Sequence, residues 1–271
     1  MARRKHARRS NPSQTRRILN VLPSKNMEND WGFLNAVDSG VVGAPAALPT
    51  TKDLRESWWT IGDQGSTGSC VGWATADSVL RWHFVKAGRL AKNDLLAMRF
   101  IWMAAKETDE FVSQPTTFIE EDGTSLKAAL DIARKYGAVL DKVLPFKTGK
   151  LYPSAVKTFY ALAAQRKIAS YFNLQRNLAN WRTWIATEGP ILTRLDVDAT
   201  WDSALQTSGR LDTYFAATAR GGHAVAIVGY TADRFIVRNS WGDKAWGDKG
   251  FGYASYSYAQ AAFTEAYGVT L

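Results

Sequence analysis

Apolar residues recur at helical spacing through the first half of the chain. Behind Cys70 they fall three or four positions apart over residues 76–84, and Gly88 ends the pattern. Residues at this spacing share one face of an α-helix, which a protein core can cover. Residues 95–106 and 125–136 show the same periodicity. The pattern predicts amphipathic helices in this half of the chain.

From Gly189 onward the pattern changes to short runs of β-branched and aromatic residues separated by glycine and aspartate. The runs are ILTRLDV, HAVAIVGY, RFIVRNSW and GFGYASY (residues 191–197, 223–230, 234–241 and 250–256). Such runs favour strands. Because helices precede the strands and do not alternate with them, we predict an α+β fold with two lobes.

The net charge of +9 is concentrated near the N-terminus. Residues 1–27 carry eight Lys or Arg residues and no acid, which leaves 26 basic and 25 acidic residues in the rest of the chain. So polar a segment cannot bury a core of its own. We therefore expect residues 1–47 to be a basic, flexible arm and linker ahead of a domain at residues 48–271. Deleting residues 1–27 would then leave the fold and its chemistry intact.

The positive arm suits contact with an anionic surface or a nucleic acid. A solubilising extension or a transport address is the alternative. A nucleic-acid-binding module that rests on the arm alone has less support, because the rest of the chain is nearly neutral. No cofactor is suggested by the sequence, and we expect a monomer.

The apolar runs also bear on the cellular compartment. They are shorter than the roughly 20 residues that a spanning helix needs, so no membrane span is predicted. The basic start continues into polar residues, which is not typical of a Sec signal peptide. A single cysteine, Cys70, cannot form an internal disulfide, so the chain suits the cytoplasm or another reducing compartment. Delivery into a target cell as an effector is compatible with the same features.

Cys70 stands where a predicted helix begins. A thiol attacks as its thiolate, and its pKa falls at a helix N-terminus and beside a cationic imidazole. His6 lies in the arm and His83 lies more than three turns along the same helix, so His223 is the remaining candidate base. Asn239 ends the next strand, where an antiparallel hairpin can bring it beside the imidazole.

Three motifs around these residues resemble the papain-like cysteine peptidases. They are QGSTGSC (residues 64–70), HAVAIVGY (223–230) and NSWGDKAWG (239–247), in the order in which the family has them. The stretches LPTTKDLRE, DGTSLKAALDIARKYGAV and EGPILTRLDVDATW resemble further parts of the same domain. The resemblance covers residues 48 to about 258.

The resemblance implies a two-lobed papain-like fold, with a helical left lobe (about 59–142), a β-barrel-like right lobe (about 143–271) and the active-site cleft between them. It implies a cysteine peptidase that hydrolyses peptide bonds through a Cys-His-Asn triad and an acyl-enzyme. The residues it assigns are the nucleophile Cys70, the base His223, the orienter Asn239, the oxyanion donors Gln64 and the Cys70 amide, and Trp241 as a shield. For the substrate cleft we predict Gly123, Thr124, Ser125, Leu195, Trp201 and Gly222.

The chain departs from the family pattern at a few positions. Thr67 stands where secreted members have a disulfide cysteine, which fits a reducing compartment. Val71 and Gly72 replace the usual Trp-Ala, and Ala245 lengthens the loop between two tryptophans, so the shape of the subsites stays open. The roughly 48 residues ahead of Pro49 are too few, and lack the helical pattern, for the inhibitory prosegment of secreted members.

Alternatives remain for the chemistry. Papain-fold acyl transferases, deamidases and peptide ligases use the same acyl-enzyme, and a catalytically silent binding protein is a weaker alternative because such proteins usually lose the cysteine or histidine. Asp196, Asp198 and Asp202 lack the glycine and glutamate of a calcium loop, so no metal site is predicted. If Cys70 and His223 form a thiolate–imidazolium pair, the thiol pKa should lie well below about 8.5. A buried, inert cysteine is the alternative.

Overall fold

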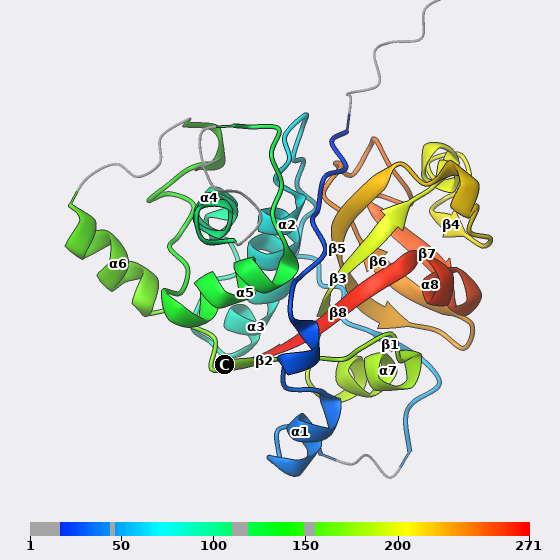
Figure 1. The fold of residues 1–271 in the computed structure, drawn as a ribbon, viewed down its shortest axis with the longest axis horizontal. Coiled ribbons are helices and arrows are strands. Elements are labelled where there is room, and N and C mark those ends of the chain that lie inside the picture. Colours follow the sequence, from blue (N-terminus) through cyan, green and yellow to red (C-terminus); the bar gives the residue numbers. More distant parts are fainter. Residues whose placement is uncertain (1–16, 44–46, 110–118, 149–154) are drawn as a thin grey trace, which may run out of the picture.

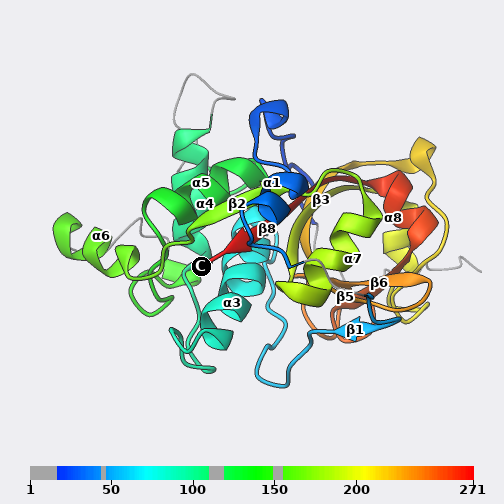
Figure 2. The ribbon, with the colours of Figure 1, turned by 90° about the horizontal axis from the view of Figure 1, so that it is seen from below.

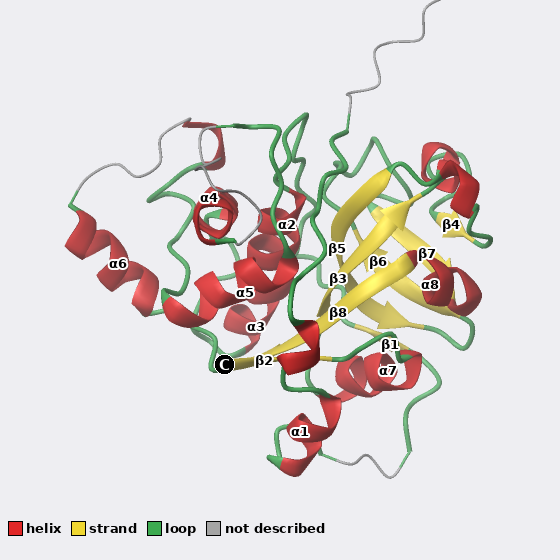
Figure 3. Cartoon of the chain, in the orientation of Figure 1, coloured by secondary structure: helices red, strands yellow, loops and turns green. Residues whose placement is uncertain are grey.

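Helices and strands separate into two lobes that lie side by side (Figures 1 and 3). The computed structural model describes residues 17–43, 47–109, 119–148 and 155–271. The predicted α+β fold with two lobes is confirmed. No helix in the described ranges is both long and apolar enough to cross a membrane.

The helical lobe contains the three helical segments that the periodicity predicts. The first is continuous from Cys70 to Lys86 and includes a π-helical stretch that is buried along its whole length. The helices of this lobe are α2 (Cys70–Gly72), η2 (Trp73–Leu80), α3 (Arg81–Lys86), α4 (Met98–Thr108), α5 (Leu126–Lys135) and α6 (Val156–Ala164). The segment from Cys70 is buried because it lies at the interface between the lobes, where η2 packs on β5 of the sheet.

The strands of the second lobe form one sheet in the order β2-β8-β3-β5-β6-β7-β4, with β1 also paired to β5. Their bounds are β1 (Lys52–Asp53), β2 (Ser170–Asn173), β3 (Ile191–Val197), β4 (Arg210–Leu211), β5 (Gly221–Tyr230), β6 (Arg234–Arg238), β7 (Phe251–Ser255) and β8 (Phe263–Thr270). Helix α7 (Leu178–Thr187) packs on β3 and β5, and α8 (Tyr256–Ala262) packs on β7 (Figure 2). The pairings among the described strands do not close the sheet, so the lobe is an open sheet and not a closed barrel.

The boundary between the lobes lies further along the chain than the sequence indicates. Helix α6 lies beside the other helices (Figure 1), and its Phe159 ring is 5.1 Å from the Phe100 ring of α4. Gly137 has φ +92°, and a Cβ there would collide with the carbonyl oxygen of Ala163. The helical lobe therefore continues to about residue 164, because the apolar side of α6 is covered by α4 and not by the sheet.

A buried ion pair fixes the central helix against the sheet. The Nη2 of Arg238, at the end of β6, lies 2.9 Å from a carboxylate oxygen of Asp77 in η2, and Arg81 binds the other oxygen at 3.0 Å. Arg238 also donates to the hydroxyl of Ser78 at 2.6 Å. Buried charges are tolerated when partners of this kind satisfy them. The contact sets the position of the helix relative to Asn239, the residue after β6.

Residues 17–43 do not form a linker apart from the lobes. Residues 17–24, here called the strap, run between the two lobes as the dark blue segment of Figure 1. Helix α1 (Phe33–Asp38) packs beside β2. Val21, Ala36 and Val42 are buried. A few apolar side chains therefore anchor this mostly polar segment against the two lobes. Residues 1–16, which carry six of the eight basic residues, lie outside the described ranges, and their contact with an anionic surface stays a prediction.

Candidate active site

Cys70 begins the central helix at the interface between the lobes. The residue is fully buried, and its sulfur accepts a hydrogen bond from the backbone amide of Ala224, the residue after His223. The helix packs closely on α4 because Gly72 has no side chain, and a Cβ there would collide with the carbonyl oxygen of Met98. The thiol of the helical lobe therefore lies at the start of β5 in the sheet.

His223 and Asn239 form a buried hydrogen-bonded pair on neighbouring strands. β5 and β6 are antiparallel, and Asn239 directly follows β6. The Nε2 of His223 lies 2.8 Å from Oδ1 of Asn239, and the amide of Ser240 donates to the same oxygen at 2.8 Å. An atom that accepts from a backbone N–H is an oxygen, so Nε2 carries the imidazole proton. Nδ1 makes no hydrogen bond with any described residue and keeps its lone pair.

Two tryptophans enclose the imidazole. The rings of Trp241 and Trp201 lie with centroids 4.8 and 5.6 Å from that of His223, and Trp201 stacks on Trp246 at 4.5 Å. All are buried. A dry environment strengthens the hydrogen bond between His223 and Asn239, which fits the shielding position predicted for Trp241. Trp201, which the sequence analysis predicts in the substrate cleft, is buried and packs against the imidazole.

Gln64 lies in the loop before Cys70, and both ends of its amide are fixed. Nε2 donates to the carbonyl of Thr67 at 3.0 Å, and Oε1 accepts from the hydroxyl of Ser240 at 2.8 Å. The backbone amide of Gln64 also donates to the carbonyl of Ser240 at 2.9 Å. Because a carboxamide nitrogen carries two hydrogens, one N–H of Gln64 remains for a further acceptor. The side chain has the chemistry of an oxyanion donor held in one orientation.

Gln64→Ala is expected to lower kcat/KM about 100-fold to 1,000-fold, the usual loss for one oxyanion donor. Ser240→Ala is the matched control, because it removes the hydroxyl that orients Gln64 and leaves the amide donor in place. Its loss should be much smaller. The measurement is kcat/KM on one peptide, with thermal melts to show that both variants are folded. Equal losses in the two variants would contradict a donor role for Gln64.

Burial acts against a thiolate–imidazolium pair, because it disfavours the charged form of both the thiol and the imidazole. Burial raises the pKa of Cys70 to about 11, against the opposing effect of the Ala224 amide. Burial also lowers the pKa of His223 to about 4, with Arg17 adding to the effect and the hydrogen bond to Asn239 opposing it. Both residues have no exposed surface, and removing water disfavours the charged form of each.

Alkylation of Cys70 by iodoacetamide is expected to be slow at neutral pH and to accelerate with rising pH. Below a thiol pKa of about 11 the thiolate fraction grows roughly tenfold per pH unit. The rate in the folded chain should therefore still be rising at pH 9 to 10, whereas the unfolded chain should respond around the pKa of a free thiol, about 8.5. A rate that reaches its plateau below pH 7 in the folded chain would contradict this result.

The strap contacts three of the predicted cleft residues. The amide of Val21 donates to the carbonyl of Gly222 at 3.1 Å, and the amide of Leu22 donates to the carbonyl of Thr124 at 3.1 Å. A Cβ on Gly123 would collide with the carbonyl oxygen of Asn20. Two segments from different lobes thus bind one extended piece of chain, and their glycines admit its backbone. The strap therefore lies between these two segments, where the substrate cleft is predicted.

The other predicted cleft residues have different positions. Ser125 caps α5, since its side chain accepts from the amide of Ala128 at 3.3 Å. Leu195 is fully buried in the sheet opposite His223.

Several residues of the site were missed from the sequence. Arg194 of β3 donates from Nε to the carbonyl of Val21 at 3.2 Å, and Glu265 of β8 accepts from the amide of Ser24 at 2.9 Å. Both contacts hold the strap against the sheet. Arg17 was assigned to the flexible arm, where one arginine among eight basic residues gives no signal of its own.

The three aspartates considered for calcium have other partners. Asp196 and Asp202 form ion pairs with Arg194 and Arg220, and Asp198 accepts from the hydroxyl of Tyr258 at 2.7 Å. Within the described residues no group of three or more His, Cys, Asp or Glu side chains has the arrangement of a metal site.

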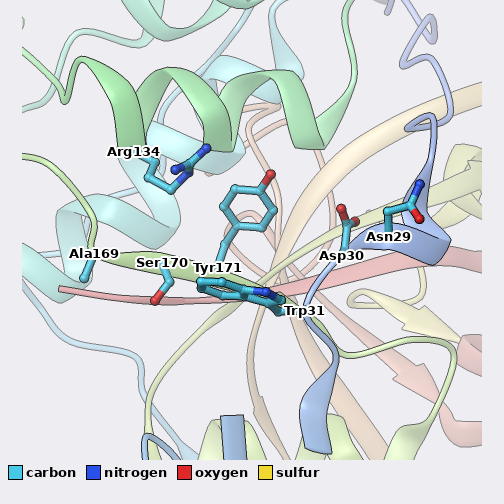
Figure 4. A pocket seen from close by; sticks show the side chains of 7 residues that line it. All are labelled: Asn29, Asp30, Trp31, Arg134, Ala169, Ser170 and Tyr171. Atoms are coloured by element: carbon cyan, nitrogen blue, oxygen red, sulfur yellow. The ribbon is translucent and has the colours of Figure 1, made fainter. Parts of the chain in front are cut away.

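A pocket of about 240 Å³ lies away from Cys70, where residues 29–31, α5 and β2 meet (Figure 4). The ring of Tyr171 stands between Arg134 on one side and Asp30 on the other (Figure 4). Two of the polar groups that line the pocket have partners outside its lining: Asp30 pairs with Lys127, and the hydroxyl of Tyr171 donates to Asp131 at 3.2 Å. None of its lining residues belongs to the cluster around Cys70.

Comparison with solved structures supports the papain-like fold. Xylellain, a cysteine protease from Xylella fastidiosa, is 20% identical with a TM-score of 0.73, and the match covers 96% of this chain and 99% of that one. Digestive procathepsin L 3 of Tenebrio molitor larval midgut is 18% identical with a TM-score of 0.60, over 85% and 72% of the two chains. A Carica candamarcensis cysteine protease, CMS1MS2, solved in complex with E-64, is 19% identical with a TM-score of 0.59, over 82% and 99%.

Comparison of sequences gives the family. No curated protein sequence matches the chain. The family described as papain family cysteine protease matches residues 48–267, most of the chain and all three motifs around Cys70, His223 and Asn239. The chain therefore belongs to the papain family of cysteine proteases.

Proposed function

We propose that the protein hydrolyses peptide bonds with Cys70 as nucleophile, His223 as base and Asn239 as orienter. The observation that carries the proposal is the His223 tautomer: Asn239 accepts the proton on Nε2, which leaves the Nδ1 lone pair in the cluster that also holds the thiol. A base in this form can take a proton. Membership of the papain family supports the same assignment.

In the first half of the reaction, Sγ of Cys70 bonds to the carbonyl carbon of the substrate, and the thiol proton passes to Nδ1 of His223. The carbonyl oxygen becomes an oxyanion that accepts from the free N–H of Gln64 and from the backbone amide of Cys70. The C–N bond then breaks, His223 returns the proton to the leaving amine, and the acyl group stays on sulfur as a thioester.

In the second half, water attacks the thioester carbonyl and gives one proton to His223. The C–S bond breaks, the proton returns to sulfur, and a carboxylic acid leaves. Asn239 holds the imidazole plane through both halves, and Trp241 keeps water from their hydrogen bond. Hydrolysis requires water as the acyl acceptor, which is where a transferase or ligase would differ.

The proposal is tested by incubating the full chain with a peptide library in H₂¹⁸O, with Cys70→Ala as the control. The expected products are new peptide ends whose carboxyl group carries one ¹⁸O, and they should be absent in the control. Ammonia release without chain cleavage, joined peptides without ¹⁸O, or products that persist in Cys70→Ala would overturn the proposal.

A further inference from the structure

Asp198 is a buried carboxylate behind the aromatic rings that enclose the imidazole. It directly follows β3 and has no exposed surface. Its Oδ2 accepts from the backbone amide of Phe215 at 2.8 Å, and its Oδ1 accepts from the hydroxyl of Tyr258 at 2.7 Å. The hydroxyl of Thr200 also donates to Oδ1. Neutral donors therefore hold both oxygens of this carboxylate.

No ion pair accounts for the Asp198 carboxylate in the described part of the chain. Arg220 is the cation beside it, but its guanidinium pairs with Asp202 at 2.9 Å and reaches only the backbone carbonyl of Asp198. Burying a carboxylate without a cation costs free energy, so its presence calls for an explanation. What this carboxylate provides is a fixed orientation of the Tyr258 hydroxyl.

The Tyr258 hydroxyl joins Asp198 to Trp201. Nε1 of Trp201 donates to this hydroxyl at 3.0 Å, and the hydroxyl donates its own proton to Asp198. Tyr258 is fully buried in α8, and its ring packs at 90° to that of Tyr214 with centroids 5.7 Å apart. The indole of Trp201 therefore has a fixed polar end in addition to its stack on Trp246.

The ring of Trp201 is one of the two tryptophan walls that confine His223. It stands at 88° to the imidazole, with centroids 5.6 Å apart. Among the described residues the imidazole has one hydrogen-bond partner, Asn239 at Nε2, and Nδ1 has none. The torsion that turns a histidine ring has broad minima, so one hydrogen bond does not fix the ring plane. The orientation of the base therefore depends on where its walls are held.

We propose that Asp198 and Tyr258 are positioning residues for the reaction. The Asp198 carboxylate orients the Tyr258 hydroxyl, and this hydroxyl holds Trp201 where its ring confines the imidazole of His223. Both residues act through Trp201. The Trp201 amide also donates to the carbonyl of Asp198 at 3.2 Å, so the carboxylate and the indole belong to one turn of the chain. The proposal rests on the proposed function for the role of His223 as base.

Tyr258→Phe tests the chain of contacts, because it removes the hydroxyl and keeps the ring. For one peptide, kcat should fall about tenfold while KM stays within about twofold, since the base is misplaced for proton transfer and the substrate contacts remain. Tyr267→Phe is the matched control. Tyr267 is equally buried in the same lobe, and its hydroxyl donates to Asp30 at 2.8 Å. It should leave both constants unchanged.

Equal kcat values in these two folded variants, or a loss in KM alone, would overturn the proposal. Asp198→Asn provides a second comparison, because a carboxamide has one oxygen where the carboxylate has two. It should lower kcat by itself. Added to Tyr258→Phe it should lower kcat little further, since the same chain is already broken. Losses that multiply in the double variant would contradict a shared route through Trp201.

The position of the imidazole is measured without turnover, through hydrogen exchange of the His223 Nε2 proton. This proton is buried and bonded to Asn239. Its ¹⁵N–¹H signal is assigned by its loss in His223→Gln. Exchange should be about tenfold faster in Tyr258→Phe than in Tyr267→Phe, because the imidazole leaves Asn239 more often. Equal exchange rates would overturn the positioning role.

These outcomes are separate from the proposed function. A chain that yields no ¹⁸O-labelled products but shows the difference in exchange has the positioning contacts without the hydrolysis. A chain that hydrolyses peptides with equal kcat and equal exchange in the two tyrosine variants has the hydrolysis without them.

Discussion

Cys70→Ala is expected to abolish peptide hydrolysis, with kcat/KM falling by at least about 10⁴-fold. The acyl-enzyme needs a nucleophile, and the chain has no second thiol to replace it. The substitution removes one buried sulfur and leaves the close packing of Gly72 on α4 unchanged. The measurement is kcat/KM for a single peptide with wild-type and variant chains at equal concentration.

Circular dichroism melts provide the control for folding in this variant. Removing a small buried atom costs on the order of 1 kcal/mol, so the variant should remain folded at assay temperature. Cys70→Ser gives a second comparison, because it keeps a hydroxyl of similar size whose proton is far harder to remove. A folded Cys70→Ala chain with wild-type turnover would place the chemistry elsewhere in the molecule.

His223→Gln is expected to cost nearly as much, again at least about 10⁴-fold in kcat/KM. Glutamine fills much of the space between Trp201 and Trp241 but cannot take a proton from the thiol or return it to the leaving amine. The measurement is kcat/KM across pH 5–9. The variant should lose the activity at every pH in this range and not merely shift its optimum.

Asn239→Ala is the matched comparison for His223→Gln. It removes the acceptor of the Nε2 proton at 2.8 Å but leaves the imidazole enclosed by its tryptophans. The loss should therefore be smaller. A folded Asn239→Ala chain as inactive as His223→Gln would show that Asn239 does more than orient the base, and His223→Gln with near wild-type activity would remove histidine from the mechanism.

The residues of the candidate active site could be singled out from the sequence because each stands in its own short motif, around Cys70, His223 or Asn239. The residues around Cys70, His223 and Asn239 each lie at the end of a helix or strand, and the periodicity that predicts those elements also gives their ends. The antiparallel pairing of β5 with β6 then brings His223 and Asn239 together. Helices and strands of the core can be predicted because the apolar residues of their buried faces recur at regular spacing along the sequence.

The position of the strap could not be predicted in this way. Its contacts join residues separated by 46 positions for Arg17 and Asp63 and by 224 for Arg17 and Trp241, and its backbone pairs with two segments from different lobes. The strap has few apolar residues, so no periodic pattern in its sequence indicates that it lies between the lobes. The burial that raises the pKa of Cys70 likewise depends on contacts made only in the folded chain, and no local pattern in the sequence shows it.

The lobe boundary shows a related limit. Helix α6 follows the expected end of the helical lobe in sequence but packs on α4 in space. Its amphipathic pattern indicates a helix with one apolar face, and that face fits either lobe equally well. Only the three-dimensional contact between Phe159 and Phe100 decides which lobe receives it.

Trapping of the acyl-enzyme tests the role of Cys70 most directly. The full chain is mixed with an activated peptide ester and quenched in acid before hydrolysis is complete, and the intact mass and the digested peptides are measured. The expected result is one added acyl group, located on the peptide that contains Cys70 and absent in Cys70→Ala. Product formation with no adduct on Cys70, or an adduct on another residue that supports turnover, would contradict the assignment of Cys70 as the nucleophile.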